Sequence, residues 1–144
     1  MIKTLLTLTA LALPTATLAQ QGNPGGHFVE NWDLDSNSQV SLAEAEERRN
    51  DIFTTFDMNE DGQLDAEEYK AFDEARAADM QGQGDHGQNG LKGVNAGMMR
   101  SFNDTDGNGT VSREEFTSHT AAWFERMDRN GDGVVTTADF GRKG

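Results

Sequence analysis

Four stretches of the chain place oxygen-bearing side chains at the same alternating spacing. In Asp33–Glu44, Asp57–Glu68, Asp104–Glu115 and Asp128–Asp139, Asp or Asn stands at positions 1, 3 and 5, and a carboxylate stands at position 12. Alternate residues of a tight loop can direct their oxygens at one point, and Ca²⁺ prefers six to eight oxygen ligands at roughly 2.3–2.6 Å. The spacing therefore predicts four calcium sites, which we number loops 1 to 4 along the chain.

The same kinds of oxygen donor recur at each position of the four loops. Positions 1, 3, 5, 9 and 12 offer side-chain oxygens, with position 9 often acting through water, and position 7 offers its carbonyl. The predicted ligands are Asp33, Asp35, Asn37, Gln39, Ser41 and Glu44; Asp57, Asn59, Asp61, Gln63, Asp65 and Glu68; Asp104, Asp106, Asn108, Thr110, Ser112 and Glu115; and Asp128, Asn130, Asp132, Val134, Thr136 and Asp139. A polar turn that binds nothing is the alternative, and it stays open for loops 1 and 4 taken singly.

Loops 1 and 4 depart from the common pattern. Glycine stands at position 6 of loops 2, 3 and 4, where the sharp turn needs a positive φ, but loop 1 has Ser38 there. The left-handed conformation costs such a residue about 1–2 kcal/mol, so we expect weaker binding at loop 1. Loop 4 ends on Asp139, whose shorter side chain favours the smaller, octahedral Mg²⁺ at Asp128–Asp139.

Helices are predicted between the loops. Apolar residues recur at near-helical spacing after loops 1 and 3, as Ala45, Ile52, Phe53 and Phe56 and as Phe116, Trp123, Phe124 and Met127. Ser41 with Glu44, and Ser112 with Glu115, have the spacing of a capping box at a helix start. We expect the apolar residues to form the core.

The two halves of the chain are repeats. An offset of 71 residues aligns Ser41 with Ser112 and Glu44 with Glu115, which indicates a duplicated two-loop unit. The second repeat is irregular at its start, because Phe102 precedes loop 3 by two residues, whereas Phe or Met directly precedes loops 2 and 4.

The distribution of glycine suggests how the domain is divided. Residues 80–97 are rich in glycine and are predicted to be a flexible linker. We expect a single domain over residues 28–144, with loops 1 and 2 in residues 28–79 and loops 3 and 4 in residues 98–144.

The short distance between loops 1 and 2 limits how the loops can pair. Only residues 45–56 lie between them, so one helix of about 15 residues, roughly 22 Å long, has to leave loop 1 and enter loop 2. Loops 1 and 2 then lie at opposite ends of this helix. We expect loop 2 to pair with loop 3 through Leu64 and Val111, and loop 1 with loop 4 through Val40 and Val135. In the alternative, the shared helices break, and loop 1 pairs with loop 2 and loop 3 with loop 4.

The loop sequences follow the pattern D-x-[DN]-x-[DN]-G-x5-E, and over about residues 28–140 the chain resembles the EF-hand calcium-binding superfamily, which includes calmodulin. The closest resemblance is to the short secreted EF-hand proteins of bacteria. It implies an all-α fold, an EF-hand array of four calcium loops joined by helices, with short β-bridges between paired loops. The resemblance is specific for calcium binding and not for the biological role, and we expect an extracytoplasmic calcium buffer or sensor. The alternative is a calcium-folded module that binds an unidentified protein partner through an apolar groove.

Charge and composition argue against several other classes. The net charge of −13 disfavours binding to nucleic acid or anionic membranes. Cysteine is absent, so disulfides and thiol nucleophiles are excluded. The histidines His27, His86 and His119 are isolated in the sequence, and we expect a calcium-binding monomer rather than an enzyme.

The first residues have the features of a secretory signal peptide, expected over residues 1–19. A short basic start precedes an apolar run from Thr4 to Leu13, and Thr17–Ala19 provides a small-x-small cleavage signal. The apolar run is shorter than the roughly 20 residues of a membrane span, so no membrane association is expected after cleavage. Residues 20–27 are expected to be a disordered lead-in, and the protein to be periplasmic or secreted.

Overall fold

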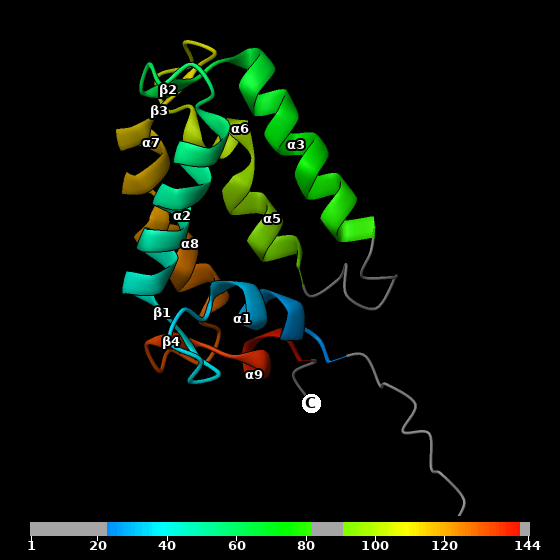
Figure 1. The fold of residues 1–144 in the computed structure, drawn as a ribbon. Coiled ribbons are helices and arrows are strands. Elements are labelled where there is room, and N and C mark those ends of the chain that lie inside the picture. The colour runs from blue at the N-terminus through cyan, green and yellow to red at the C-terminus, as the bar shows by residue number, and fades with distance from the viewer. Residues whose placement is uncertain (1–22, 82–90, 142–144) are drawn as a thin grey trace, which may run out of the picture.

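A computed structural model describes residues 23–81 and 91–141. The elements are α1 (Gly26–Trp32), β1 (Val40–Ser41), α2 (Leu42–Phe56), β2 (Gln63–Leu64), α3 (Ala66–Gln81), α5 (Lys92–Met98), α6 (Arg100–Asn103), β3 (Val111–Ser112), α7 (Arg113–Ser118), α8 (Thr120–Met127), β4 (Val134–Val135) and α9 (Thr137–Phe140). The helices lie between two pairs of loops at opposite ends of the molecule (Figure 1). The expected signal peptide lies outside the described residues. In the described ranges, no helix has both the length and the apolar character needed to cross a membrane.

The loops pair across the two halves of the chain. Val40 lies opposite Val135 in the antiparallel pair β1–β4, and Leu64 lies opposite Val111 in the antiparallel pair β2–β3. All four side chains are fully buried. The expected pairing of loop 2 with loop 3 and of loop 1 with loop 4 is confirmed, and the arrangement with broken shared helices is not adopted.

Helix α2 determines this pairing. It runs without a break for 15 residues from loop 1 to loop 2, as the sequence predicts. The Ser41 side chain accepts a hydrogen bond from the Glu44 N–H, and the Glu44 carboxylate accepts one from the Ser41 N–H, so the predicted capping box is confirmed. Ser112 and Glu115 form the same capping box at the start of α7.

The corresponding helix of the second half is interrupted. It is divided into α7 and α8 at His119, although the spacing of the apolar residues after loop 3 predicts a helix through this position. The His119 Nδ1 atom lies 2.8 Å from the Glu115 carbonyl oxygen, and the Thr120 hydroxyl donates to the Thr117 carbonyl at 2.7 Å. Side chains that bind carbonyls of the preceding turn compete with helical hydrogen bonds, and these two bonds lie at the break.

Parts of the two glycine-rich regions form helix, whereas residues 20–22 and 82–90 lie outside the described residues. The segment expected as a linker over residues 80–97 is helical at both ends, since α3 extends to Gln81 and α5 begins at Lys92. A Cβ atom on Gly97 would lie 1.8 Å from Trp123 Cδ1, so this glycine allows close helix packing. The expected disordered lead-in over residues 20–27 likewise ends inside α1, and a Cβ on Gly25, which directly precedes α1, would lie 2.0 Å from Phe140 Cδ2.

The core consists mainly of two aromatic groups. Near loops 1 and 4, Trp32 contacts Phe28 and Trp123, with ring centroids 5.2 and 5.0 Å away. Near loops 2 and 3, Phe116 contacts Phe53 and Phe72 at 5.8 and 6.1 Å. Of the apolar residues predicted for the core, Ala45, Phe53, Phe116, Trp123, Phe124 and Met127 are buried, and Ile52 and Phe56 pack partly buried against them.

Candidate metal centres

The carboxylate at position 12 closes each loop with the same hydrogen bonds. In loop 2, Glu68 Oε1 accepts from the N–H groups of Met58 (2.9 Å) and Asn59 (3.2 Å), and Oε2 accepts from the Asp65 N–H (3.0 Å). The N–H groups of positions 2, 3 and 9 bind the last carboxylate in the other loops too, through Glu44, Glu115 and Asp139. These hydrogen bonds therefore hold the carboxylate at position 12, the last predicted ligand, beside the start of the loop.

The aspartate at position 1 accepts hydrogen bonds from positions 5 and 6. Asp57 Oδ1 accepts from the Asp61 N–H, and Oδ2 accepts from the Gly62 N–H, both at 3.0 Å. Asp33, Asp104 and Asp128 make the equivalent bonds. Side-chain oxygens at positions 3 and 5 accept from the N–H two residues further on in every loop. All four loops thus share one hydrogen-bonded frame.

This frame needs two left-handed residues in each loop. Position 6 has a positive φ throughout, including Ser38 at 67°, as the sequence predicts for this non-glycine position. Position 4 also has a positive φ, at Ser36 (63°) and Glu60 (58°), and sequence reasoning missed this requirement. The glycines at position 4 of loops 3 and 4, Gly107 and Gly131, were the available signal. Loop 1 has no glycine at either position, so it carries more backbone strain than the others.

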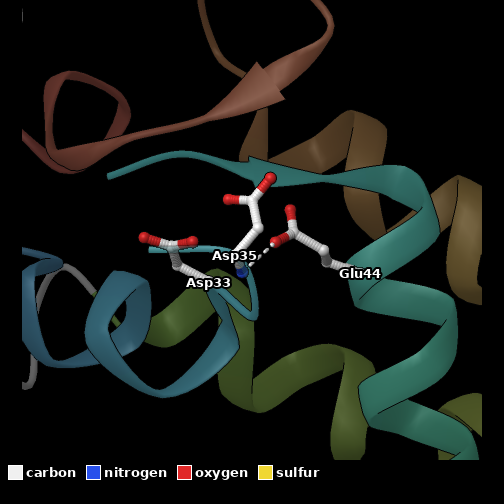
Figure 2. Close-up of side chains that lie close together, drawn as sticks. All are labelled: Asp33, Asp35 and Glu44. Atoms are coloured by element: carbon white, nitrogen blue, oxygen red, sulfur yellow. Dashed lines mark hydrogen bonds between the residues drawn. The ribbon is translucent and has the colours of Figure 1, made fainter. Parts of the chain in front are cut away.

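Three loops gather their carboxylates into a cluster. One oxygen from each member lies within 4.8 Å of the others in three groups: Asp33, Asp35 and Glu44; Asp57, Asp61 and Glu68; and Asp104, Asp106 and Glu115. Figure 2 shows the first group, with Glu44 reaching from the start of α2 toward Asp33 and Asp35. Three converging anions repel one another, and hard oxygen donors of this kind suit Ca²⁺. The residues present therefore fit the ion that the loop pattern implies.

Loop 4 does not form such a cluster. Within the described residues, Asp128, Asp132 and Asp139 do not bring three carboxylate oxygens together as the other loops do. Asp139 makes the same backbone hydrogen bonds as the glutamates at position 12, for example from the Arg129 N–H at 2.9 Å. The structure therefore places Asp139 on the same N–H groups as the glutamates, and the effect of its shorter side chain on ion preference stays a prediction.

Hydrogen bonding keeps two of the predicted ligand carboxylates, Glu44 and Glu115, ionised. The Ser112 N–H is the largest influence on Glu115, and it and the other hydrogen bonds lower the pKa of Glu115 to about 2 against the opposing effect of burial. Burial raises the pKa of Glu44, but hydrogen bonds from Ser41, Leu34 and Asp35 outweigh it and lower the pKa below its usual value. Both groups are therefore in the anionic form that a cation requires.

The remaining predicted ligands lie at the strands. The hydroxyls of Ser41 and Ser112 at position 9 serve as helix N-caps and donate to the Oε2 atoms of Glu44 and Glu115. Asp65 and Thr136 at position 9 also accept hydrogen bonds from the first turn of the next helix. Of the residues at position 7, Gln63 and Val134 begin β2 and β4, and Gln39 and Thr110 directly precede β1 and β3. Binding through these carbonyls stays a prediction.

Comparison with known proteins agrees with this geometry. The family model for the EF hand matches residues 50–73, 104–118 and 120–142, which include loops 2, 3 and 4. The chain belongs to the EF-hand calcium-binding superfamily. No curated protein matches the sequence. Loop 1 forms a carboxylate cluster outside the matched segments, and loop 4 lies in a matched segment without such a cluster. Loops 2 and 3 meet both criteria.

Proposed function

We propose that the chain is an extracytoplasmic calcium-binding protein that uses all four loops and acts as a buffer or sensor of the ion rather than as an enzyme. The observation that carries this proposal is the hydrogen-bonded frame common to the four loops, which orients the first and last carboxylates of each loop in the same way. The proposed ligands are those predicted from the sequence, with Mg²⁺ competing at loop 4.

The two loop pairs are proposed to differ in affinity. Loops 2 and 3 both have glycine at position 6 and a carboxylate cluster. In the other pair, loop 1 has strained serines and loop 4 lacks the cluster. We therefore expect loops 2 and 3 to fill first. Affinities in the range of about 10⁻⁴–10⁻³ M suffice for calcium binding outside the cell.

Calorimetric titration of the chain from residue 20, with and without Mg²⁺, tests the ligand assignment. Glu68→Gln and Glu115→Gln are each expected to remove one of the tightest binding events. Glu67→Gln and Glu114→Gln are matched controls, because these exposed neighbours lose the same charge without belonging to a carboxylate cluster. If the control variants lose the same events, the effect comes from net charge and the ligand assignment is wrong.

Calcium is also proposed to complete the fold. Clustered carboxylates repel one another in the absence of a cation, and an ion that binds only the folded state stabilises it. Chelation is expected to lower the melting temperature and the helical dichroism of the protein. An unchanged melting temperature after chelation contradicts this proposal.

The extracytoplasmic location is supported by the signal-like features of residues 1–19. Expression of the full chain in a bacterium, followed by cell fractionation and N-terminal sequencing, tests it. The exported protein is expected to begin at Gln20. Retention of the intact chain in the cytoplasm contradicts the proposed location.

A second candidate function, partner binding through an apolar groove, is favoured by one cavity. This cavity has a volume of about 400 Å³, is bordered by α1, α2, α3 and α5, and includes apolar side chains of Phe28, Ile52, Phe56, Phe72, Val94 and Met98. An environment-sensitive apolar dye distinguishes a protein that opens this groove when calcium binds from a simple buffer. A sensor gains dye binding when calcium is added, whereas a buffer changes little.

A further inference from the structure

Arg49 is a fully buried positive charge in the middle of α2. It has an exposed fraction of 0 %, and no carboxylate in the described part of the chain forms an ion pair with it. Its Nη2 atom donates to Asn103 Oδ1 (2.8 Å) and to the Phe116 carbonyl (2.6 Å), and Nη1 donates to the Gly97 carbonyl (3.0 Å). The guanidinium carbon lies 4.2 Å from the centre of the Phe116 ring. Burial lowers the pKa of Arg49 to about 10, so it stays protonated at neutral pH.

Two of these partners stand at the two ends of loop 3. Asn103 directly precedes Asp104, the first predicted ligand, and Phe116 directly follows Glu115, the last one. One planar guanidinium therefore contacts both chain segments that have to stay together for these ligands to converge. The fork of N–H donors in arginine suits such a bridge, because its directions are fixed.

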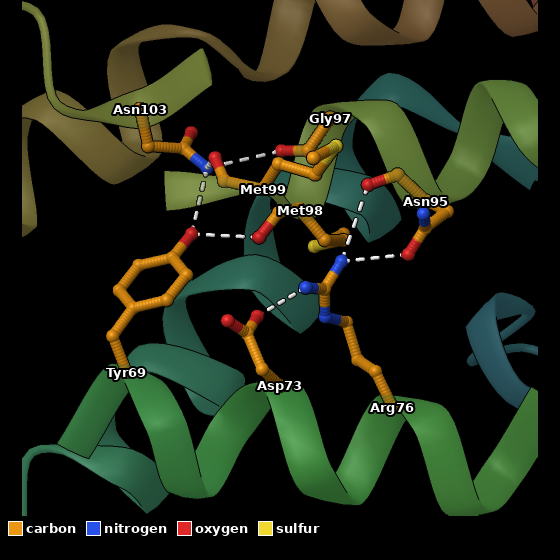
Figure 3. A network of polar contacts seen from close by, with 8 residues as sticks. All are labelled: Tyr69, Asp73, Arg76, Asn95, Gly97, Met98, Met99 and Asn103. Atoms are coloured by element: carbon orange, nitrogen blue, oxygen red, sulfur yellow. Dashed lines mark hydrogen bonds and ion pairs between the residues drawn. The ribbon is translucent and has the colours of Figure 1, made fainter. Parts of the chain in front are cut away.

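Asn103 extends this contact toward loop 2. Its Nδ2 atom donates to Tyr69 Oη at 3.1 Å, and Tyr69 Oη donates to the Met98 carbonyl at 2.6 Å (Figure 3). Tyr69 directly follows Glu68, the last predicted ligand of loop 2. A buried series of hydrogen bonds therefore joins the residues next to both loops of this pair.

The corresponding positions around loop 1 are different. With the offset of 71 residues, Trp32 stands where loop 3 has Asn103, Ala45 stands where it has Phe116, and Thr120 stands in place of Arg49. The Thr120 hydroxyl donates within its own segment, to Thr117, and makes no bridge between loop ends. Loop 1 therefore provides an internal comparison without the arginine bridge.

We infer that Arg49 is a positioning residue that preorganises loop 3 for calcium by holding together the residues beside its first and last ligands. The inference rests on the proposed function, because it requires loop 3 to bind the ion. A loop whose ends are already fixed loses less conformational freedom when its ligands close around an ion. Removing the guanidinium also leaves buried carbonyl and amide oxygens without donors.

Arg49→Lys tests this role, because it keeps the charge and removes the fork. Arg76→Lys is the matched control. Arg76 also donates to a backbone carbonyl and a side-chain oxygen, both of Asn95, and its guanidinium lies over the Phe72 ring (Figure 3). None of these contacts is to a residue at the end of a loop. Calcium titration is followed by nuclear magnetic resonance at the amides of Gly62, Gly109 and Gly133 and of Ser38, each hydrogen-bonded to the first aspartate of its loop.

Arg49→Lys is expected to weaken calcium binding reported by Gly109 about tenfold or more, the usual scale for residues that orient metal ligands, and to leave the Ser38 and Gly133 responses unchanged. Tyr69→Phe, which keeps the ring, is expected to weaken the same response by a smaller factor, and it decides the matter if Arg49→Lys fails to fold. The inference is overturned if Arg49→Lys weakens calcium binding equally at all loops, or if the control Arg76→Lys weakens it as much. It is also overturned if neither Arg49→Lys nor Tyr69→Phe has an effect. If the Gly109 response to calcium is the same in Glu115→Gln as in the unsubstituted protein, loop 3 is not a calcium site. In that case the proposed function, and not only this inference, is wrong for loop 3.

Discussion

Leu64 lies directly opposite Val111 in the bridge between β2 and β3, although the two residues belong to different halves of the chain. Val40 and Val135 make the equivalent contact at the other end of the molecule. Each half of the sequence therefore contributes one loop to each pair. Neither half contains a complete pair, so the tandem repeat of the sequence does not correspond to two independent folding units.

Separate halves of the chain are expected to fold only together. The fragments 20–81 and 91–144 each lack the partner strands of both their loops, so each should have little helical dichroism alone. Mixed in equal amounts with calcium, they are expected to form a 1:1 complex with the helix content of the intact chain. Dichroism and size-exclusion chromatography measure this. Folding of either fragment by itself contradicts the observed pairing.

Ser38→Gly is expected to stabilise the protein and to strengthen calcium binding at loop 1. Ser38 has a φ of 67°, and relief of about 1–2 kcal/mol of strain exceeds the roughly 0.4–1 kcal/mol by which glycine loosens the unfolded chain. The net gain in the free energy of unfolding is therefore about 0.5–1 kcal/mol. Denaturant unfolding of the calcium-loaded protein measures it.

Gly62→Ser in loop 2 is the reciprocal control for this change. A Cβ at Gly62 has no neighbour within 4 Å, so its cost comes from the backbone alone. It is expected to destabilise the protein by a similar amount. Opposite signs for the two substitutions support the explanation from strain, and equal signs exclude it.

Asp139→Glu is expected to increase the calcium affinity of loop 4 and to reduce competition by Mg²⁺. The added methylene lets the carboxylate extend toward Asp128 and Asp132 and offer both oxygens to a large ion. Asp51→Glu makes the same chemical change at an exposed site of α2 and is the control. Titration of calcium in the presence and absence of Mg²⁺ measures the effect. An unchanged ratio of the two affinities shows that side-chain length does not limit loop 4.

Tyr69 is expected to ionise near pH 12 in the folded protein. Burial raises the pKa of Tyr69 to about 12 from 10.0, and its exposed fraction is 1 %. Because the pKa is higher in the folded state, the neutral Tyr69 hydroxyl contributes fully to the free energy of unfolding below pH 10. This contribution of about 2–3 kcal/mol is lost as the pH rises toward 12. The chain has one tyrosine, so ultraviolet absorbance follows it directly.

Urea-unfolded protein is the control for this titration and is expected to ionise near pH 10. Denaturant unfolding between pH 9 and pH 11 measures the linked loss of stability. A folded-state pKa near 10 contradicts the burial of the hydroxyl in the hydrogen bonds to Asn103 and Met98.

The features that the sequence determined by itself are local ones. A ligand loop is specified within twelve consecutive residues, so alternating oxygens and a capping glutamate such as Glu44 can be recognised before any fold is known. The pairing of loops was also predictable, because the segment between loops 1 and 2 is too short for two helices joined by a turn. Chain length alone then places those loops at opposite ends of one helix.

The features that only the tertiary structure decided depend on contacts between distant segments. Gly25 and Gly97 resemble flexible linker residues in sequence, yet they are the places where Phe140 and Trp123 approach the backbone. Arg49 resembles one more charged residue of an exposed helix face, yet it is buried against Asn103 and Phe116 from the other half of the chain. Composition and spacing describe a residue together with its chain neighbours. Close packing and burial are set by the segments that fold against it, and these are known only when the whole chain is folded.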